Sequence, residues 1–384
     1  MKKIKVINLI WHMGDGGAQQ IVINYLRAFR DDPDIDFRVC VFSSPTNSKY
    51  DREIRENHYP VIYLNEPNTK CPVPYVRKFF RRAAITRAWQ SAFADFQPDI
   101  VHVHLSALLE QALPAITHSN IPVRLYTLHS NPYRQKGRLQ KTLCDAFRNR
   151  QVIPICLTEE QVQMARDWYG ITKYELVRNG MDVQALRRDC CPKQDARAQF
   201  GLDPDAFVVI GVGRLNPVKN FPLLIEALGE IRKTRPDAKL VLAGDGEERS
   251  SLLRLAQEKN LTDHVIFLGT IPNVVPLYSA ADVLGVTSFS EALPLAVLEA
   301  QICGLRCVLS DGVPSESILS ESTRKMPAGA TAQDWAKALL DTQYSGSTAL
   351  PLELFDVHQV NRQIKEIYVN YFRKTQTPAD ADTF

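Results

Sequence analysis

Two glutamates, Glu291 and Glu299, stand eight positions apart in the stretch SFSEALPLAVLEAQ, with Pro294 between them. Proline is favoured at the first position of a helix, so Pro294 should begin one, with Glu291 before it and Glu299 inside it. The backbone N–H groups of Leu295 and Ala296 would then be available to a phosphate oxygen. A carboxylate can accept two hydrogen bonds from a vicinal diol, so Glu299 suits a ribose and Glu291 a hexose. The alternative is that both are ordinary surface charges.

Two cations precede another expected helix in the stretch GVGRLNPVKNFPLL. Arg214 and Lys219 lie five residues apart, before a helix that should start near Phe221, and together they could clamp a diphosphate. Solvated loop charges are the alternative. Lys219 does not stand in a G-x-x-x-x-G-K-[ST] context, so this is not the phosphate loop of an ATPase.

Glycines follow the first apolar run, in MGDGGAQQ. Gly14, Gly16 and Gly17 should form a turn that opens a helix over 18–29, whose first N–H groups could receive a phosphate or a sugar hydroxyl. The spacing is not G-x-G-x-x-G, so a nicotinamide cofactor is poorly supported. A tight turn between strand and helix, without a ligand, is the alternative.

Two further loops could contact a nucleotide. Gly244 lies in LAGDGEE, where a glycine turn would allow the backbone to pass close to the ligand. An Asp-Gly turn into a helix is the alternative. Thr270 opens the loop 270–274, which could supply backbone contacts to a base.

Short apolar runs alternate with helical stretches along the whole chain, which predicts parallel sheets covered on both faces. Two series of such runs imply an α/β protein with two doubly wound, Rossmann-like domains that face each other across a cleft. The runs lie at 3–10, 37–44, 61–64, 99–105, 123–130 and 152–158, and again at 207–215, 239–246, 264–269, 282–288 and 305–311.

The polar stretch around 180–195 has no strand-like run, so we expect an N-terminal domain over 1–185 and a C-terminal domain over 186–356. Residues 357–384 should form a helix and tail that cross back to the N-terminal domain. Charge divides similarly, since residues 1–190 hold 27 basic and 19 acidic side chains and the remainder 19 and 24.

The composition is that of a soluble globular protein, with 45% hydrophobic and 23% charged residues among 384. No apolar run approaches the roughly 20 residues that cross a bilayer. We interpret MKKIKVINLI as a first buried strand rather than a signal peptide. The eight cysteines form no C-x-x-C pair, which favours reduced thiols in a cytosolic protein. The Asp-x-Asp-like strings fall in polar turns, so we expect no metal site.

The segment EALPLAVLEA resembles the E-x₇-E motif of the retaining glycosyltransferases of family four, which have the GT-B fold and use nucleotide-sugar donors. Four other segments match that family in the same order, and the resemblance covers nearly the whole chain. These segments are GGAQ, VRNGMD, GRLNPVKN and AGDGEERSSL.

The resemblance implies a role for each candidate in the C-terminal half. Arg214 and Lys219 would bind the donor diphosphate, Glu291 the donor sugar and Glu299 the ribose. Ala292 stands where the family usually has glycine, so the loop after Glu291 has less conformational freedom here.

In the N-terminal half, the resemblance implies that Gly16 and Gly17 approach the phosphate and the acceptor. It also implies that His129, in YTLHSNPY, points at the transferred sugar. A buried capping histidine is the alternative for His129. His102 and His104 alternate along one strand and share a face, where one of them should pack in the core.

The expected activity is that of a retaining, metal-independent hexosyltransferase that needs no cofactor and takes a UDP- or GDP-linked donor. No carboxylate is placed as a nucleophile, so the resemblance suggests front-face attack with the leaving diphosphate accepting the acceptor's proton. Two alternatives are a nucleotide-sugar epimerase on the same scaffold and a non-catalytic nucleotide-sugar-binding protein. The intact set of cations and glutamates argues against lost activity.

The stretch YVRKFFRRAAITRAW (75–89) carries basic and aromatic residues and no acids, typical of a helix lying on an anionic membrane. An ordinary basic surface helix is equally compatible. In the membrane interpretation the acceptor is a lipid-linked or lipopolysaccharide-type saccharide, and the protein is cytoplasmic with peripheral contact to the inner face of the cytoplasmic membrane. Nucleic-acid binding could also account for the basic stretch, but it would not explain the arrangement of Glu291 and Glu299. The basic residues are Arg77, Lys78, Arg81, Arg82 and Arg87.

Overall fold

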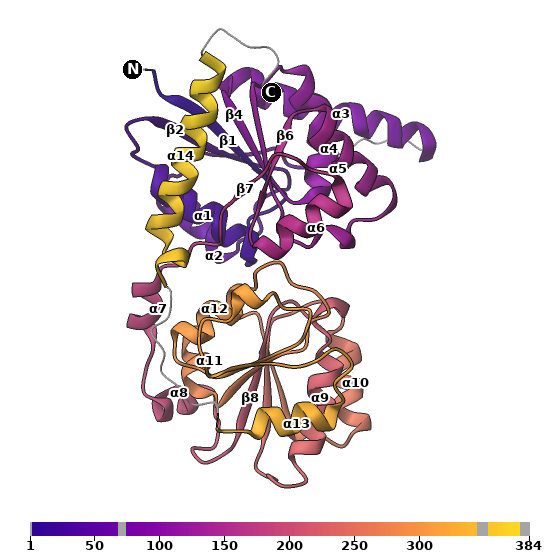
Figure 1. Cartoon of the computed structure of the whole chain (residues 1–384), viewed down its shortest axis with the longest axis vertical. Coiled ribbons are helices and arrows are strands. Elements are labelled where there is room, and N and C mark those ends of the chain that lie inside the picture. The colour runs from indigo at the N-terminus through magenta and orange to yellow at the C-terminus, as the bar shows by residue number, and fades with distance from the viewer. Residues whose placement is uncertain (1, 68–73, 344–351, 377–384) are drawn as a thin grey trace. The chain divides into compact units, whose positions relative to one another are not determined.

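A computed structural model describes residues 2–67, 74–343 and 352–376 and divides the chain into two compact units (Figure 1). Met1–Gly180 and Val357–Phe384 form the N-terminal unit, and Met181–Asp356 forms the C-terminal unit. The division thus falls five residues before the boundary expected from the sequence. The last helix, α14 (Val357–Gln376), is counted with the N-terminal unit.

The N-terminal unit is built on a parallel sheet of seven strands in the order β3-β2-β1-β4-β5-β6-β7. This is the doubly wound order, and it reverses between β1 and β4. The strands are β1 (Ile4–Ile10), β2 (Ile35–Val41), β3 (Val61–Tyr63), β4 (Ile100–His104), β5 (Val123–Thr127), β6 (Val152–Cys156) and β7 (Glu175–Leu176).

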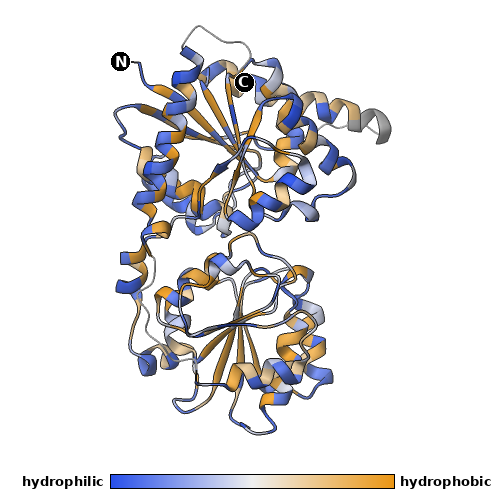
Figure 2. Ribbon diagram, in the orientation of Figure 1, coloured by the Kyte–Doolittle hydropathy of each residue, from blue (hydrophilic) through white to orange (hydrophobic). Residues whose placement is uncertain are grey.

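Helices cover both faces of this sheet because successive strand residues point to opposite sides. Val6 and Ile10 face one apolar layer, with α1, α2 and α14, whereas Ile7 and Leu9 face the other, with α3 to α6. Figure 2 shows the resulting hydrophobic strands inside hydrophilic outer helix faces. The helices are α1 (Gly17–Phe29), α2 (Lys49–Glu56), α3 (Pro74–Phe96), α4 (Ser106–His118), α5 (Gly137–Asn149) and α6 (Glu159–Tyr169).

The C-terminal unit repeats the design with a parallel six-stranded sheet in the order β10-β9-β8-β11-β12-β13. Its order reverses between β8 and β11. The strands are β8 (Val208–Val212), β9 (Lys239–Ala243), β10 (Val265–Gly269), β11 (Val283–Val286), β12 (Cys307–Leu309) and β13 (Thr323–Lys325).

One face of this sheet packs against α9, α10 and α13, and the other packs against α8, α11 and α12. No helix among the described residues of either unit is long and apolar enough to cross a membrane. The helices are α7 (Val183–Asp189), α8 (Lys193–Gln199), α9 (Phe221–Ile231), α10 (Arg249–Glu258), α11 (Val275–Ala280), α12 (Leu295–Ile302) and α13 (Ala332–Leu340). Short 3-10 helices cover Pro132–Arg134, Pro217–Lys219, Thr262–His264, Ser315–Ser317 and Leu352–Phe355.

Every strand predicted from the sequence is present, with ends within three residues of those expected. Strands β7 and β13 were not predicted, because they have only two and three residues and include charged side chains, so neither forms an apolar run. One helix start also differs. Pro294 is the N-cap residue of α12 rather than its first helical residue.

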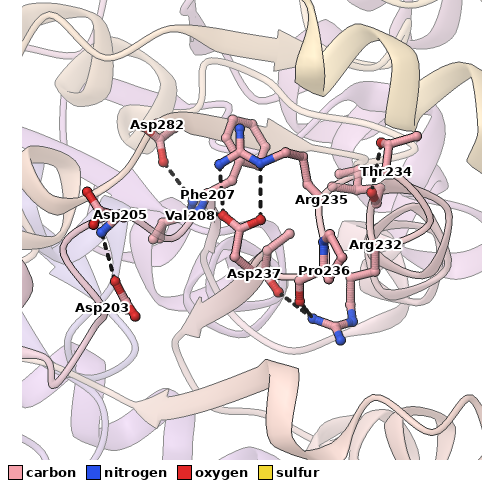
Figure 3. A network of polar contacts seen from close by, with 12 residues as sticks. Asp203, Asp205, Phe207, Val208, Arg232, Thr234, Arg235, Pro236, Asp237 and Asp282 are labelled. Carbon is pink, nitrogen blue, oxygen red and sulfur yellow. Dashed lines mark hydrogen bonds and ion pairs between the residues drawn. The ribbon is translucent and has the colours of Figure 1, made fainter.

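Carboxylates fix the starts of the strands in the C-terminal sheet (Figure 3). Asp237, just before β9, accepts a hydrogen bond of 3.0 Å from the Phe207 N–H, and Asp282, just before β11, accepts one of 2.7 Å from the Val208 N–H. The Arg235 guanidinium holds Asp237 at 2.8 Å and is the main reason that the pKa of this carboxyl falls to about 2. These bonds set β8 against its neighbours and thereby help to place the loops at the other end of the strands.

Candidate functional site

Lys219 and Glu291 meet beyond the carboxyl ends of β8 and β11. The Lys219 Nζ lies 2.7 Å from Glu291 Oε1, with 21% and 13% of the two side chains exposed. Because β8 and β11 are neighbours where the strand order reverses, their exit loops lie together. Ligands of open α/β sheets bind at this position. The structure therefore brings these two predicted site residues together where a ligand is expected.

Hydrogen bonds between the two loops prepare this arrangement. The buried Thr287 hydroxyl lies 2.9 Å from the Lys219 carbonyl oxygen and 2.8 Å from that of Asn220. The Phe289 N–H donates to the Val218 carbonyl at 2.8 Å. The loop after β11 therefore fixes the backbone of the loop that carries Lys219. Because both loops are already ordered, the ion pair forms without the entropic cost of ordering them.

Arg214 lies in the same loop as Lys219 but extends into solvent. Its side chain is 71% exposed, and its Nε lies 3.6 Å from Glu247 Oε2. An exposed pair of this kind contributes little to stability. Arg214 can therefore exchange the carboxylate for a phosphate at small cost.

Gly244 brings the loop after β9 against the loop that carries Arg214. Its φ is +137°, and a Cβ added here would lie 1.9 Å from the Gly213 carbonyl oxygen. The Gly244 N–H also donates to the Gly269 carbonyl at 2.8 Å. The glycine is thus required by close packing of two backbones, whatever its relation to a nucleotide. Thr270 follows β10 directly and is exposed.

Glu299 is held by a tyrosine that the sequence did not point to. The hydroxyl of Tyr278, on α11, donates to Glu299 Oε2 at 2.9 Å. Burial, followed by the nearby Glu299 charge, raises the pKa of Tyr278 well above its usual value. Helix α12 begins with Leu295 and Ala296, which precede Glu299 in the chain and are partly exposed. The N-cap residue Pro294 makes no side-chain hydrogen bond to this end of the helix.

The glycine loop of the N-terminal unit is tightly tied. Gly16 is the N-cap of α1, which begins at Gly17, and no side chain caps this end. The Gly14 N–H donates to His12 Nδ1 at 3.0 Å, and the buried Gln19 amide donates to the His12 carbonyl at 3.1 Å. A Cβ on Gly16 would lie 2.3 Å from Gln19 Oε1, so a larger residue here would require the Gln19 side chain to move.

His129 follows β5 at the carboxyl edge of the N-terminal sheet and belongs to a cluster of three histidines. Its Nε2 lies 2.8 Å from His104 Nδ1, whereas His102 contacts the Tyr368 hydroxyl at 2.8 Å and Thr127 Oγ1 at 2.7 Å. Burial lowers the pKa of His102 to about 3 and that of His129 to about 4, and it holds the pKa of His104 well below its usual value. All three rings are therefore neutral at pH 7, and both His102 and His104 are in the core.

Asn8 and Tyr368 complete this cluster, and neither was predicted from the sequence. Asn8 occupies a core-facing position of β1 between Val6 and Ile10, and it is fully buried. The sequence could have pointed to Asn8, because it is a polar residue at a strand position that faces the core. Tyr368 could not be found in this way, since its partners lie more than 250 positions away along the chain.

The basic stretch forms the first part of α3. The side chains of Arg77 and Lys78 are not among those that the structure describes. Phe79 and Phe80 are 70% and 50% exposed, and Arg81 forms an ion pair with Glu66. Two large exposed aromatic rings beside arginines are unusual for a surface facing only water.

A pocket of about 380 Å³ lies where α3, α4 and α5 meet. Four cations and two carboxylates line it, so the pocket carries an excess of positive charge. The charged lining residues are Arg82, Arg138, Lys141, Arg150, Glu110 and Asp145.

The described residues contain no group of three or more His, Cys, Asp or Glu side chains that could hold a metal ion. The cysteines that the structure describes are all free. The expectation of a metal-independent reaction stays a prediction.

Two family models match the chain. Residues 15–185 match the model described as Glycosyltransferase Family 4, and residues 192–341 match Glycosyl transferases group 1. The chain belongs to this glycosyltransferase family. The resemblance drawn from the E-x₇-E segment is thereby confirmed, and the family is one of hexosyltransferase-type enzymes. Membership favours sugar transfer over the epimerase and the non-catalytic binding protein considered above.

Relatives in the family are named for several sugar transfers. EpsF of Bacillus subtilis (strain 168), named as a glycosyltransferase, is 25% identical over 319 residues, which cover 80% of this chain and 79% of EpsF. The UDP-Gal:alpha-D-GlcNAc-diphosphoundecaprenol alpha-1,3-galactosyltransferase of Escherichia coli is 30% identical over 224 residues, covering 56% of this chain and 58% of that protein.

Solved structures support the GT-B fold. Anabaena HepE in complex with UDP and glucose has a TM-score of 0.78 at 22% identity, covering 96% of this chain and 100% of that chain. WaaG, a glycosyltransferase of lipopolysaccharide biosynthesis, has a TM-score of 0.67 at 16% identity, covering 96% and 98%. The fold expected from the sequence is confirmed.

Proposed function

We propose that this glycosyltransferase moves a sugar from a UDP- or GDP-linked donor to a saccharide acceptor and retains the anomeric configuration. The observation that carries the proposal is the ion pair between Lys219 and Glu291 at the carboxyl edge of the C-terminal sheet. In this proposal Lys219 would bind the diphosphate and the neighbouring Glu291 would accept hydrogen bonds from sugar hydroxyls. A purely structural ion pair would not need to lie where the strand order reverses.

The other donor contacts follow from the same loops. We assign Arg214 and Lys219 to the diphosphate, together with the first N–H groups of α12, at Leu295 and Ala296. Glu299 receives the ribose hydroxyls, with its carboxylate oriented by Tyr278. The loops that begin at Gly244 and Thr270 would border the nucleoside.

Two groups complete the assignment. In the C-terminal unit, Glu291 would accept hydrogen bonds from the transferred sugar. In the N-terminal unit we assign His129 to that sugar and Gly16 and Gly17 to the phosphate and acceptor, as the family resemblance implies.

In the proposed reaction the bond between the anomeric carbon and the diphosphate oxygen breaks, and the acceptor oxygen bonds to that carbon on the same face. The acceptor's proton passes to the departing diphosphate oxygen, so no separate base and no cofactor is required. A carboxylate held 2.7 Å from an ammonium, such as Glu291, is a poor nucleophile, which favours this course over a covalent intermediate. Arg214, Lys219 and the α12 N-terminus would stabilise the leaving group.

We further propose a lipid-linked acceptor in the synthesis of a surface polysaccharide or lipopolysaccharide. The exposed Phe79 and Phe80 on a basic helix suit the surface of an anionic membrane. The positive pocket beside α3 adds to this attraction. The named Escherichia coli relative uses a diphosphoundecaprenol-linked acceptor. The enzyme would then act in the cytoplasm, in peripheral contact with the inner face of the cytoplasmic membrane.

The first test is thermal stabilisation of the wild type by a panel of nucleoside diphosphates and nucleotide sugars, repeated on Glu299→Ala. We expect one donor family to raise the melting temperature selectively and the substitution to weaken that effect. If no nucleotide shifts the wild-type transition, the donor site is wrongly assigned. Product analysis with that donor and lipid-linked acceptors should then yield a new glycoside, whose anomeric configuration NMR can compare with the donor's.

A further inference from the structure

A chain of buried polar groups connects helix α14 to His129 within the N-terminal unit. The Asn8 amide Nδ2 donates to the Tyr368 hydroxyl at 3.4 Å, and Asn8 Oδ1 lies 2.7 Å from His104 Nε2. His104 Nδ1 in turn lies 2.8 Å from His129 Nε2. Asn8, His104 and Tyr368 have no solvent exposure, so water cannot replace these partners.

The neighbouring strands explain how the chain forms. Asn8 pairs with His102 in the register of β1 and β4, and His104 pairs with Thr127 in the register of β4 and β5. His129 lies two residues beyond Thr127 and so continues the same face of the sheet. The polar groups therefore form a row inside the apolar layer beneath α1 and α14.

The amide orientation of Asn8 determines where the protons lie. Its Oδ1 can only accept, so His104 Nε2 must carry the proton of that bond. A neutral imidazole has one proton, so His104 Nδ1 is an acceptor and His129 Nε2 must donate to it. Since His129 is also neutral, its Nδ1 is left with a lone pair.

Tyr368 opposes rotation of the amide. Its hydroxyl lies 2.8 Å from His102 Nδ1 and can donate to that nitrogen, which leaves an oxygen lone pair for the Asn8 N–H. Reversing the amide would require the Tyr368 hydroxyl to donate to the Asn8 oxygen over 3.4 Å, which exceeds the usual O–H···O range of about 2.5–3.0 Å.

We propose that Asn8 and His104 are positioning residues that hold His129 in the tautomer protonated at Nε2, so that Nδ1 accepts a hydrogen bond from a hydroxyl of the transferred sugar. The proposal rests on the sugar-binding role assigned to His129 above. A donor that carries that hydroxyl would be preferred over one with hydrogen or a carboxylate in its place. One hydrogen bond of this kind corresponds to a preference of about two- to tenfold.

The tautomer can be read directly from the full-length wild type labelled with ¹⁵N-histidine. Long-range ¹H–¹⁵N correlation spectra should show His129 protonated at Nε2 and unprotonated at Nδ1. The opposite tautomer would overturn the proposal, and this measurement requires neither a donor nor a variant that folds.

Two matched substitutions test the relay. His104→Phe removes the acceptor for His129, whereas Tyr126→Phe removes a buried hydroxyl from the opposite face of β5 and leaves the row of polar groups intact. We expect His104→Phe to give a mixture of His129 tautomers and to lower kcat about tenfold, with nucleoside diphosphate affinity unchanged. Tyr126→Phe should leave the His129 signals as in the wild type. Equal effects of the two variants on those signals would contradict the relay.

A conservative variant separates this role from packing. In His104→Asn the short amide can again accept from His129, so part of the lost turnover should return, and a failure to exceed His104→Phe would count against the relay. The two proposals fail separately. If no nucleotide stabilises the wild type, the donor assignment is lost, whereas the tautomer of His129 still reports on Asn8 and His104.

Discussion

The ammonium of Lys219 lies 2.7 Å from the carboxylate of Glu291, although 72 positions separate the two residues in the sequence. The pair is mostly buried, so removing one partner leaves the other poorly solvated. The pair is therefore expected to contribute both to the stability of the C-terminal unit and to donor binding.

Lys219→Met should lower kcat/KM at least a hundredfold, because it removes a cation from the leaving diphosphate. It should also lower the free energy of unfolding by about 1–3 kcal/mol, since the mostly buried Glu291 carboxylate loses a hydrogen-bond partner. Adding Glu291→Gln to this variant should recover part of the stability but none of the activity, which a double-mutant cycle can measure. Lys233→Met, in an exposed pair with Glu230, is the control and should change neither quantity appreciably.

Glu299→Ala should weaken binding of the donor nucleotide about ten- to a hundredfold, since charge-assisted hydrogen bonds to the ribose are lost. Calorimetry with matched ribo- and 2′-deoxynucleoside diphosphates tests whether the lost affinity comes from contacts with the ribose. The wild type should prefer the ribonucleotide, and the variant should bind both equally.

Tyr278→Phe is the companion variant, because it removes only the hydroxyl that orients Glu299. We expect a loss of a few-fold in affinity. A ribonucleotide preference that survived in Glu299→Ala would show that another residue contacts the sugar.

Gly244→Ala should strongly destabilise the C-terminal unit, because its Cβ would lie 1.9 Å from the Gly213 oxygen and its φ of +137° suits only glycine. We expect a loss of more than about 3 kcal/mol or failure to fold, measured by urea denaturation. Gly269→Ala is the matched control. Its φ is +67° and its Cβ would meet nothing within 4 Å, so the cost should be about 1–2 kcal/mol. Equal losses would mean that the backbone contact can relax.

Acid should destabilise the N-terminal unit because the three histidines of its cluster titrate below the value of 6.5 that is normal for an exposed histidine. Above that pH both folded and unfolded rings are neutral, and the histidines do not affect the pH dependence of folding. As the pH falls from 6.5 toward 4, the value for His129, the unfolded chain binds protons that the folded unit excludes. Each such histidine should then remove up to about 1.4 kcal/mol of stability per pH unit.

Urea denaturation at pH 7.5, 6.5 and 5.5 measures this slope. His102→Phe, which removes one of the titrating groups, should show a shallower decline than the wild type. Identical slopes would mean that His102 is as readily protonated in the folded unit as in the unfolded chain.

The exposed rings on α3 should insert into anionic membranes. Phe79→Ser combined with Phe80→Ser should reduce co-sedimentation with phosphatidylglycerol-containing vesicles at least several-fold and leave the melting temperature unchanged, since both rings are exposed. Neutral phosphatidylcholine vesicles are the control and should bind the wild type weakly. Undiminished binding of the double variant would place the contact elsewhere.

The donor-site candidates could be predicted because each lies in a short local motif after a strand, as Lys219 and Glu291 do. Strand order then brings such loops together without further information. The groups that orient them could not be predicted in this way. Thr287 and Tyr278 act through hydrogen bonds between separate loops and helices, and no sequence spacing specifies such pairings.

The histidine cluster is a second example of a feature that could be predicted only in part from the sequence. The alternation of His102 and His104 indicated a shared face, but burial of both rings depends on Tyr368, which arrives from the last helix. The exposure of Arg214 likewise follows from its loop geometry rather than from its neighbours in sequence.

Helix α14 makes the N-terminal unit discontinuous in the chain. During synthesis, the contiguous residues 181–356 leave the ribosome before Ile364 and Tyr368, which complete the first sheet's apolar layer. The unit that begins translation is therefore the last to be finished, and until then the face of β1, β4 and β5 that α14 covers stays open to chaperones. A nascent chain halted before Val357 would present one finished domain and one unfinished domain.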